Sequence, residues 1–544
     1  MENYYLGNGR KWKYINEKNN GEIKNQETDE LVYNLLYQRG LSTAEDIEQF
    51  LKPDLKNLHD PFLLDGMKEA VDRILSAIQK KERILIYGDY DADGVSATSI
   101  LIRFFRSLNL LVDYYIPDRV DEGYGISDVA VDFITSNDYD LVITVDCGIS
   151  ARSQVTEIAE KCKKLGRRID IIITDHHQCK DDLIPDALAI INPHLPNSNY
   201  PFKNLCGTGV ALKLIHALGI CTGNERAFED YLDIAAVATI ADIVELKGEN
   251  RIIAKFGLEK IRNNPCIGIK ALLNAALVDK TQIDSYRVSF IIAPRINAAG
   301  RMGDAGIAVK LFTTDDESEA NKYAFALNSS NTKRQEIQDK IFNEAVSIID
   351  SDPGYNKEKV IVVYHEGWHH GVIGIVASKL VERYHKPVFV FSVENEKAVG
   401  SARGIEGFNI FKAMENQSDL LIKYGGHEQA GGLTISPLNL DLFRKRINIY
   451  ANDIITDEML IPETTIDLEA KSRDISLNMA KLISKFEPFG CGNQVPVFCY
   501  KGAMIRDKKI VGNGRHLKLS FEIDGKNIEG VYFGKGYLET GIFS

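Results

Sequence analysis

The sequence lacks the features that mark several common protein classes. Its 8 cysteines are scattered and form no CxxC pair, which excludes a zinc ribbon and a disulfide framework. No stretch approaches the roughly 18 consecutive apolar residues of a membrane span. Residues 1–18 are polar and aromatic and contain no signal-peptide core. Internal repeats and low-complexity segments are also absent from the sequence. We therefore expect a globular, cytoplasmic protein.

The charge balance is acidic rather than basic. The sequence has 65 lysine and arginine residues against 77 aspartate and glutamate residues, a formal net charge of −12. This excess argues against a general nucleic-acid coat protein. It does not exclude a nuclease, because a metal site built from carboxylates adds negative charge that bound cations cancel.

The chain is too long for one hydrophobic core. Its 544 residues have an ordinary globular composition and predict three or four domains. By periodicity and composition we divide it into an N-terminal helical segment (1–80), an α/β domain (81–250), a helical connection (251–350), a second α/β domain (351–460) and a small antiparallel β domain (461–544).

Short apolar runs alternate with helical stretches in the first α/β domain. Strands are expected at 83–89, 111–117, 140–146 and 169–175, with helices at 95–108, 127–136 and 151–165. This alternation predicts a parallel sheet with both faces covered. Three of the strands end in an aspartate: Asp89, Asp146 and Asp175. Because ligands of open α/β sheets bind beyond the carboxyl ends of the strands, these carboxylates are candidates for a site.

The first of these strands leads into three alternating carboxylates, Asp89, Asp91 and Asp93, followed by Gly94. The pattern D-x-D-x-D-G also begins a calcium-binding EF-hand loop. That loop requires a glutamate at position twelve, where this sequence has Ile100, and it follows a helix rather than a strand. We therefore favour a strand-to-helix turn that holds hard divalent cations near phosphate.

Three further motifs supply candidate ligands: TVDCGIS with Asp146, TDHHQ with Asp175, His176 and His177, and ATIADIVEL with Asp242. A lone aspartate at a strand end is more often a helix cap, and a histidine pair is more often a surface feature. Asp242 lies in an apolar run that we expect to be mid-helix, where an unpaired carboxylate costs several kcal/mol. Together these oxygen and nitrogen ligands favour Mn²⁺ or Mg²⁺. Two such cations can activate water and stabilise the leaving oxygen in phosphoryl hydrolysis.

These motifs, in this order, resemble the DHH phosphoesterase superfamily, named for the element at Asp175-His176-His177. Longer segments are similar to its RecJ family, among them PDRVDEGYG, CGTGVALKL, APRINAAGRMGDA and LNSSNTKRQEIQ. The segments GWHHGVIGIVASKLVERYHKP, GSARG and GGHEQAGGL resemble the DHH-associated domain, and FEPFGCGNQVPVF resembles the start of an OB-fold domain. The resemblance spans nearly the whole chain. It implies hydrolysis of single-stranded DNA from the 5′ end to nucleoside 5′-monophosphates.

The resemblance also implies residue roles by position. The metal ligands would be Asp91, Asp93, Asp146, His176 and Asp242, with Asp146 bridging two Mn²⁺ or Mg²⁺ ions and Asp89 as a further candidate. Asp175 and His177 would be the catalytic groups that orient the ligands or contact the substrate. Arg119, Arg301, Ser401 and Arg403 would hold the terminal 5′-phosphate, which suits the planar fork of arginine.

Other assignments leave alternatives open. Tyr124 would stack on a base. His427, in a glycine-rich segment, either contacts a phosphate or belongs to a plain turn. Arg301 and Arg403 could instead pair with nearby acids such as Asp304 and Glu406, and Trp368 is expected in the core. An OB fold needs about five strands, and the chain stops after FGKGYLETGIFS, where the family pattern continues. The OB-like domain is therefore expected to be incomplete or differently closed.

We expect a multi-domain α/β enzyme: a parallel-sheet DHH domain, a helical connection, an α/β DHH-associated domain and a C-terminal OB-like β domain. It should be a monomer acting on single-stranded DNA in repair and recombination, with single-strand-binding protein and a helicase as candidate partners. One rival is a DHH phosphodiesterase of short oligonucleotides or cyclic dinucleotides, although those enzymes are usually shorter and lack the OB segment. The other is an inactive DHH scaffold, against which the intact ligand set argues.

Overall fold

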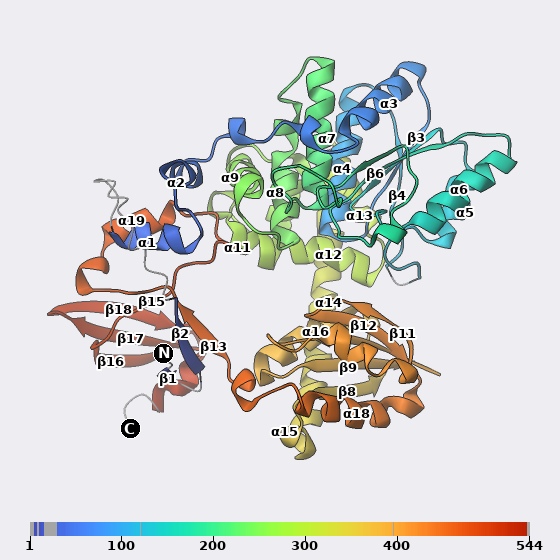
Figure 1. Cartoon of the computed structure of the whole chain (residues 1–544). Coiled ribbons are helices and arrows are strands. Elements are labelled where there is room, and N and C mark those ends of the chain that lie inside the picture. The colour runs from blue at the N-terminus through green and yellow to red at the C-terminus, as the bar shows by residue number, and fades with distance from the viewer. Residues whose placement is uncertain (1–4, 8–9, 16–29, 120, 395, 541–544) are drawn as a thin grey trace. The chain divides into compact units, whose positions relative to one another are not determined.

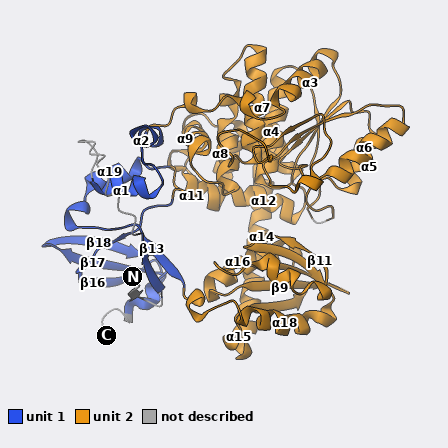
Figure 2. Cartoon of the chain, viewed as in Figure 1, with its two compact units in different colours: residues 1–51, 462–487, 494–544 blue, residues 52–461, 488–493 orange. Residues whose placement is uncertain are grey.

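The structure is a computed structural model of the chain that describes residues 5–7, 10–15, 30–119, 121–394 and 396–540 (Figure 1). The chain forms two compact units (Figure 2). Unit 1 comprises 1–51, 462–487 and 494–544, and unit 2 comprises 52–461 and 488–493. The five domain boundaries drawn from the sequence stay a prediction. Within the described part of the chain, every helix is too short or too polar to cross a bilayer.

The first sheet of unit 2 is entirely parallel, as predicted. Its strand order is β4-β3-β5-β6-β7. The strands are β3 (Ile84–Tyr87), β4 (Asp113–Tyr115), β5 (Leu141–Val145), β6 (Asp170–Thr174) and β7 (Ala189–Ile191). The chain runs from β3 to β4 on one side and then to β5 on the other. The strand order therefore reverses between β3 and β5, where an open sheet forms its ligand crevice.

Helices cover both faces of this sheet (Figure 1). Successive β3 residues point to opposite faces: Ile84 and Ile86 join one core, and Leu85 and Tyr87 join the other. The first core also contains α3 (Met67–Lys80), α4 (Ala92–Ser107), α7 (Gly207–Thr222) and α8 (Leu232–Ala241), and the second contains α5 (Asp128–Ser136) and α6 (Arg152–Lys164). Burial on both faces explains why the strands are continuous apolar runs.

The predicted helical connection is confirmed. It contains α9 (Gly248–Asn263), α10 (Ile267–Ala275), α11 (Ser285–Arg287), a π-helical turn (Val288–Ile292), α12 (Ala293–Met302), α13 (Gly306–Thr313) and α14 (Glu317–Ser351). Helix α14 has 35 residues and belongs to two cores. Ala324 and Leu327 pack in the core of the first sheet, whereas Ile341 and Ala345 pack in the core of the second. The helix therefore links the two α/β parts of unit 2.

The second sheet has the order β11-β12-β10-β9-β8, and only β8 and β9 are parallel. Its strands are β8 (Ile361–Glu366), β9 (Val388–Glu394), β10 (Lys397–Arg403), β11 (Leu421–Gly426) and β12 (Ala430–Ile435). Helix α16 (His370–Tyr384) packs with Val388 and Val390, and α18 (Leu440–Asn452) packs with Phe389 and Phe391. The helices therefore lie on opposite faces of the sheet.

Unit 1 combines both ends of the sequence. Helices α1 (Glu30–Gln38), α2 (Ala44–Leu51) and α19 (Leu477–Ser484) accompany three small sheets. These sheets contain β1 (Tyr5–Gly7), β2 (Arg10–Tyr14) and β13 (Glu463–Ile466); β14 (Leu468–Glu469) and β15 (Phe498–Cys499); and β16 (Met504–Val511), β17 (His516–Ile523) and β18 (Lys526–Tyr532).

Two features of this arrangement differ from the sequence-based expectation. The N-terminal segment was expected to be helical, but residues 10–14 form a strand that pairs in parallel with β13. The alternating sequence RKWKY is typical of a strand. Its partner β13 lies about 450 residues further along the sequence. Residues 488–493 belong to unit 2, where the Leu246 N–H donates to the Cys491 carbonyl at 2.8 Å.

Candidate metal centre

Three strand ends and one helix end deliver the candidate ligands. Asp89 follows β3, Asp146 follows β5 and Asp175 follows β6. Asp146 has a φ of 60°, a left-handed conformation that turns its carboxylate out of the strand direction. Asp242 was expected within a helix, but it caps the C-terminus of α8. The helix ends there, and the next residue, Ile243, has a positive φ of 62° and is 71% exposed.

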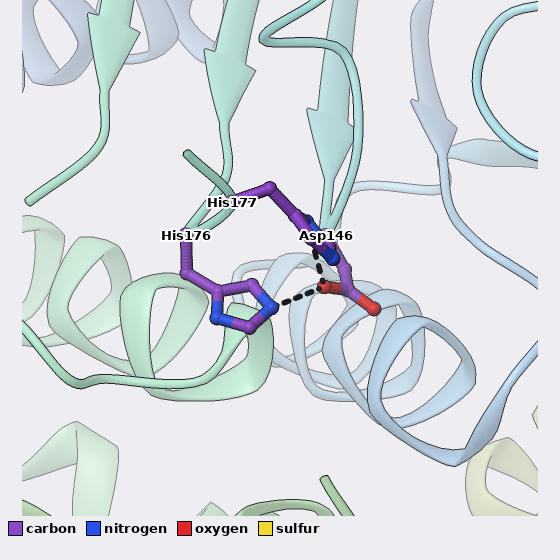
Figure 3. Close-up of side chains that lie close together, drawn as sticks. All are labelled: Asp146, His176 and His177. Carbon is purple, nitrogen blue, oxygen red and sulfur yellow. Dashed lines mark ion pairs between the residues drawn. The ribbon is translucent and has the colours of Figure 1, made fainter. Parts of the chain in front are cut away.

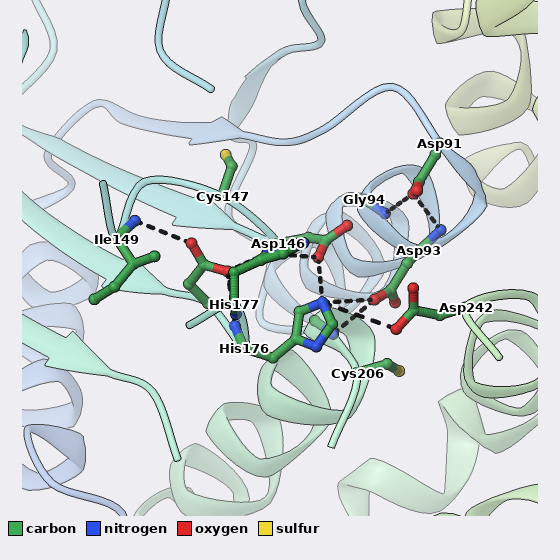
Figure 4. A network of polar contacts seen from close by, with 12 residues as sticks. Asp91, Asp93, Gly94, Asp146, Cys147, Ile149, His176, His177, Cys206 and Asp242 are labelled. Atoms are coloured by element: carbon green, nitrogen blue, oxygen red, sulfur yellow. Dashed lines mark hydrogen bonds and ion pairs between the residues drawn. The ribbon is translucent and has the colours of Figure 1, made fainter. Parts of the chain in front are cut away.

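His176 lies at the centre of the carboxylates (Figure 4), and both His176 and His177 approach Asp146 (Figure 3). Its Nε2 atom is 3.1 Å from Asp146 Oδ1, 3.8 Å from Asp242 Oδ2 and 3.9 Å from Asp93 Oδ2. Three overlapping groups place one ligand atom per residue within 4.8 Å of one another: Asp146, His176 and His177; Asp93, His176 and Asp242; and Asp89, Asp91 and Asp146. Asp146 and His176 each belong to two of the groups, and of these two residues only Asp146 has two ligand oxygens with which to bridge two cations.

The electrostatics of this carboxylate cluster favour binding of a positive counter-charge. Burial, followed by repulsion from Asp93 and Asp91, holds the pKa of Asp146 well above its ordinary value. Burial and a neighbouring carboxylate raise the pKa of Asp89 to about 8 and that of Asp242 to about 9. Burial lowers the pKa of His176, so its imidazole is held neutral with a lone pair available to a cation. Like charges this close do not ionise together without a cation.

Unsatisfied buried atoms support the same conclusion. Asp89 Oδ1, Asp146 Oδ1 and His176 Nε2 are buried and have no hydrogen-bond partner among the described residues. A buried polar atom without a partner costs about 1–3 kcal/mol, more when it is charged. Three such atoms from three segments gather in one place, and all are ligand types that Mn²⁺ and Mg²⁺ accept. The residues therefore fit a divalent metal centre.

The N-terminus of α7 holds the carboxylate of Asp93. The Gly207 and Thr208 N–H groups donate to the two Asp93 carboxylate oxygens at 2.6 and 2.8 Å. Gly207 also has no room for a side chain, since a Cβ there would lie 2.5 Å from Asp146 Oδ1. From the sequence, the segment CGTGVALKL showed only a family resemblance, and no role was predicted for Gly207 or Thr208. The glycine at the start of the helix was the sequence feature that could have indicated that this helix N-terminus binds a carboxylate.

A hydrogen-bond network fixes the DHH element. Asp175 Oδ1 accepts from the His176 and His177 backbone N–H groups at 2.7 and 3.1 Å, and Oδ2 accepts from Ile149 N–H at 3.0 Å. His177 Nδ1 lies 2.8 Å from Asp175 Oδ1 and 2.9 Å from the Tyr124 hydroxyl. Burial alone would lower the pKa of His177, but Asp175 raises it to about 9. His177 is therefore a cation beside the carboxylates at neutral pH.

Four predicted substrate residues also come together. Arg301 Nη1 donates to the Gly371 carbonyl at 3.1 Å, and Arg403 Nη1 donates to Ser401 Oγ at 3.2 Å. Burial, then Arg119, Arg334 and Arg403, lower the pKa of Arg301 to about 10. The Arg119 guanidinium lies 4.8 Å from the Tyr90 ring centroid. This is a group of neighbouring cations drawn from three separate segments of the chain.

In the described part of the chain, these arginines have no acidic partner. Among the residues that the structure describes, no carboxylate forms an ion pair with Arg119, Arg301 or Arg403. The alternative pairing of Arg301 and Arg403 with Asp304 and Glu406 is therefore not observed. Partly buried cations without counter-charges are suited to a multiply charged anion.

Two remaining predictions have different outcomes. His427 lies exposed in the turn between β11 and β12, where its N–H donates to the Ala430 carbonyl at 2.8 Å. No described contact joins its side chain to the other predicted residues. Trp368 is 2% exposed and packs in the core, as expected, with its Nε1 donating to Glu344 at 2.8 Å.

The chain matches three domain families in order along its length. Residues 83–239 match the DHH family N-terminal domain, 357–453 the DHHA1 domain and 466–543 the RecJ OB domain. It is 33% identical to the single-stranded-DNA-specific exonuclease RecJ of Escherichia coli, over 92% of this chain and 89% of that protein. The chain belongs to the RecJ family. The family and the fold class expected from the sequence are confirmed.

Three further comparisons, with two other RecJ proteins, extend the match. The Bacillus subtilis RecJ is 40% identical over 94% of this chain, and the match spans 64% of that protein. The crystal structure of Thermus thermophilus RecJ in complex with Mn²⁺ aligns with a TM-score of 0.78 at 30% identity, covering 93% of this chain and 70% of that one. The same protein in complex with Mg²⁺ aligns with a TM-score of 0.73 at 30% identity, over 94% and 70% of the two chains. The metals named for these RecJ structures are the two predicted from the ligand types.

Proposed function

We propose that this chain is a single-strand-specific DNA exonuclease that removes nucleoside 5′-monophosphates in the 5′-to-3′ direction, using two Mn²⁺ or Mg²⁺ ions. The observation that carries the proposal is the position of Asp146 between two groups of candidate ligands, in a chain of the RecJ family. A bridging carboxylate has a purpose only if two cations are present.

The residues of the site would have separate roles in this reaction. Asp91, Asp93, Asp146, His176 and Asp242 would hold the ions, with Asp89 as a further ligand or as a group that orients them. When bound, the ions supply a nucleophilic water and stabilise charge on the leaving oxygen. Asp175 orients the two histidines through their backbone and side-chain nitrogens. His177 places a positive charge 4.0 Å from Asp146, suited to a phosphate oxygen.

Polarity would come from the arginine group. A terminal phosphate monoester carries up to two negative charges and an internal diester carries one. Arg119, Arg301 and Arg403, with the Ser401 hydroxyl, would therefore favour the 5′ end through charge-assisted hydrogen bonds. The Tyr124 ring, half exposed beside His177, would stack on the base of the terminal nucleotide, and His427 remains a candidate phosphate contact.

The RecJ family and the OB domain favour this function over both rivals. A phosphodiesterase of short oligonucleotides or cyclic dinucleotides has no need of an OB domain, and an inactive scaffold has no need of a complete ligand set. A monomeric state, a role in repair and recombination, and association with single-strand-binding protein and a helicase remain predictions. A cytoplasmic location also remains a proposal, which rests on the DNA substrate.

The function is tested by digesting single-stranded DNA and blunt duplex DNA of the same sequence with Mn²⁺ or Mg²⁺. Label at the 5′ end should be released at once as a mononucleotide, while label at the 3′ end should yield a descending ladder. The duplex should resist. Prompt release of a 3′ label, or equal digestion of the duplex, would contradict the proposal.

Metal binding is expected to strengthen as the pH rises. Raised pKa values mean that the folded, metal-free protein binds protons at Asp89 and Asp242 more tightly than the unfolded chain. Their contribution to stability is present below about pH 4 and is lost as the pH rises through about 8 to 9. A bound cation displaces these protons, so affinity should rise by up to about tenfold per pH unit for each proton released.

Thermal unfolding at pH 6 and pH 8.5, with and without MnCl₂, measures this effect. The gain in Tm on adding Mn²⁺ should be larger at pH 8.5. Asp242→Asn should reduce the pH dependence of that gain. A gain that is larger at pH 6 would show that these carboxylates do not exchange protons for metal.

A further inference from the structure

Helix α12 runs alongside the candidate metal centre. Its Asn297 side chain accepts a hydrogen bond from the Ala92 N–H at 2.8 Å, within the turn that bears Asp91 and Asp93. One turn further on, Gly300 packs so closely against Tyr90 that a Cβ would lie 2.8 Å from the Tyr90 carbonyl oxygen. Arg301, of the proposed 5′-phosphate site, comes next. The C-terminal half of α12 therefore spans the distance from the metal centre to that site.

The opposite end of α12 leads to two exposed aromatic rings. Tyr286 is 65% exposed and Phe290 is 67% exposed, and their ring centroids lie 4.7 Å apart at an interplanar angle of 37°. Both residues belong to the segment formed by α11 and the π-helical turn Val288–Ile292, which continues directly into α12. Such turns are often found at functional sites. Two large exposed rings in contact are suited to binding a flat partner.

Arg295 lies between the rings and Asn297 in sequence, but it precedes Asn297 by two residues and so leaves α12 about 160° away from it around the helix, toward α14. Arg295 Nη1 donates to the Ile291 carbonyl at 2.6 Å, and its Nε donates to Asn328 Oδ1 at 2.9 Å. These bonds hold the guanidinium in place. No carboxylate among the described residues forms an ion pair with it. It is thus a partly buried positive charge that is held against α14.

The spacing along the helix sets the order of these features. Phe290 precedes Asn297 by seven residues, about 10 Å at 1.5 Å per residue. Arg301 follows Asn297 by four residues, about 6 Å in the other direction. The rings and the 5′-phosphate site therefore lie in opposite directions along the helix from Asn297, which bonds to the turn that bears Asp91 and Asp93. A strand with its 5′ end at Arg301 would reach the rings after the scissile phosphate, within about three nucleotides at a stacked spacing of about 3.4 Å.

We propose that Tyr286 and Phe290 form a stacking site for bases downstream of the scissile phosphate. This inference rests on the proposed exonuclease function and adds a second recognition point on the 3′ side of the cut. Stacking on aromatic rings accepts any base. It would hold the remaining strand in place after each nucleotide is released.

The test compares substrates that do and do not reach the rings. The Tyr286→Ala, Phe290→Ala double variant should raise KM for a 5′-phosphorylated 12-nucleotide strand by about 10- to 100-fold with little change in kcat. KM for a 5′-phosphorylated dinucleotide should stay unchanged. Phe290→Tyr should retain wild-type behaviour, whereas Phe290→Leu, which is apolar but not aromatic, should not. Leu438→Ala, at a residue 93% exposed, is the matched control for loss of exposed apolar surface.

Abasic substitutions provide an independent readout. Removing the bases at nucleotides three to five should raise KM for the wild-type enzyme and have no further effect on the double variant. An equal loss on the dinucleotide, full function of Phe290→Leu, or an abasic effect that persists in the double variant would overturn the stacking site. If the wild-type enzyme digests neither substrate, the exonuclease function itself fails. That outcome can be told apart from failure of the stacking site, because fluorescence anisotropy without metal still measures how tightly the wild type and the variant bind the strand.

Discussion

Asp146→Asn should lower hydrolysis of single-stranded DNA by at least about a thousandfold. The change keeps the shape of the side chain and removes the carboxylate shared by two of the candidate ligand groups. Metal ions contribute several kcal/mol of charge stabilisation in such reactions, and each 1.36 kcal/mol is a factor of ten in rate. Steady-state rates with saturating Mn²⁺ measure the loss.

The metal-free variant should nevertheless be at least as stable as the wild type. Asp146 is 2% exposed and its pKa is raised by burial and by neighbouring carboxylates, so an amide in its place removes the cost of ionising this buried group. The gain in Tm on adding Mn²⁺ should largely disappear. Asp186→Asn, at an exposed aspartate, serves as the matched control. Retention of full activity together with an undiminished Mn²⁺ effect on Tm would rule out a bridging role.

The strands and the ligand types were predictable from the sequence because they follow local patterns. Continuous apolar runs predicted the buried strands, and strand-end carboxylates such as Asp146 predicted the position of the site. The environment of Asp242 was predicted less well. Its apolar neighbours suggested a mid-helix position, but the helix ends at Ala241 and the positive φ of Ile243 turns the chain away. A positive φ at an isoleucine has no sequence signal.

Contacts between segments far apart in the sequence were harder to predict. Gly207 is required because Asp146 packs against its Cα, and Asn297 fixes the turn at Ala92, although each partner lies at least 60 residues away in the sequence. The strand at residues 10–14 likewise depends on β13 as its partner. Such pairings arise only when the chain folds, so local periodicity cannot reveal them. The exposure of Tyr286 and Phe290 is also a property of the folded chain alone.

Arg403→Ala should reduce kcat/KM on 5′-phosphorylated single strands by about 10- to 100-fold and should affect 5′-hydroxyl strands much less. A charge-assisted hydrogen bond contributes about 1.5–3 kcal/mol, and its full value requires the second charge of the monoester. Burial, then Arg119, lowers the pKa of Arg403, as expected for a cation with no acidic partner among the described residues. Parallel rate measurements on the two kinds of 5′ end, for wild type and variant, give the discrimination ratio directly.

Two further variants separate recognition of the 5′ end from loss of structure. Arg403→Lys keeps the charge but not the planar fork, so it should retain only part of the preference for a 5′-phosphate. Arg383→Ala removes an arginine from α16 that pairs with Asp350 at 3.4 Å on the surface, and it should leave the preference unchanged. Because Arg403 bonds to Ser401 and Ala402 of its own strand, its removal should not disturb the metal ligands, and the effect of Mn²⁺ on Tm should persist. Equal losses on phosphorylated and hydroxyl ends would mean that Arg403 binds the strand without reading its end, and that Arg119 and Arg301 set the polarity.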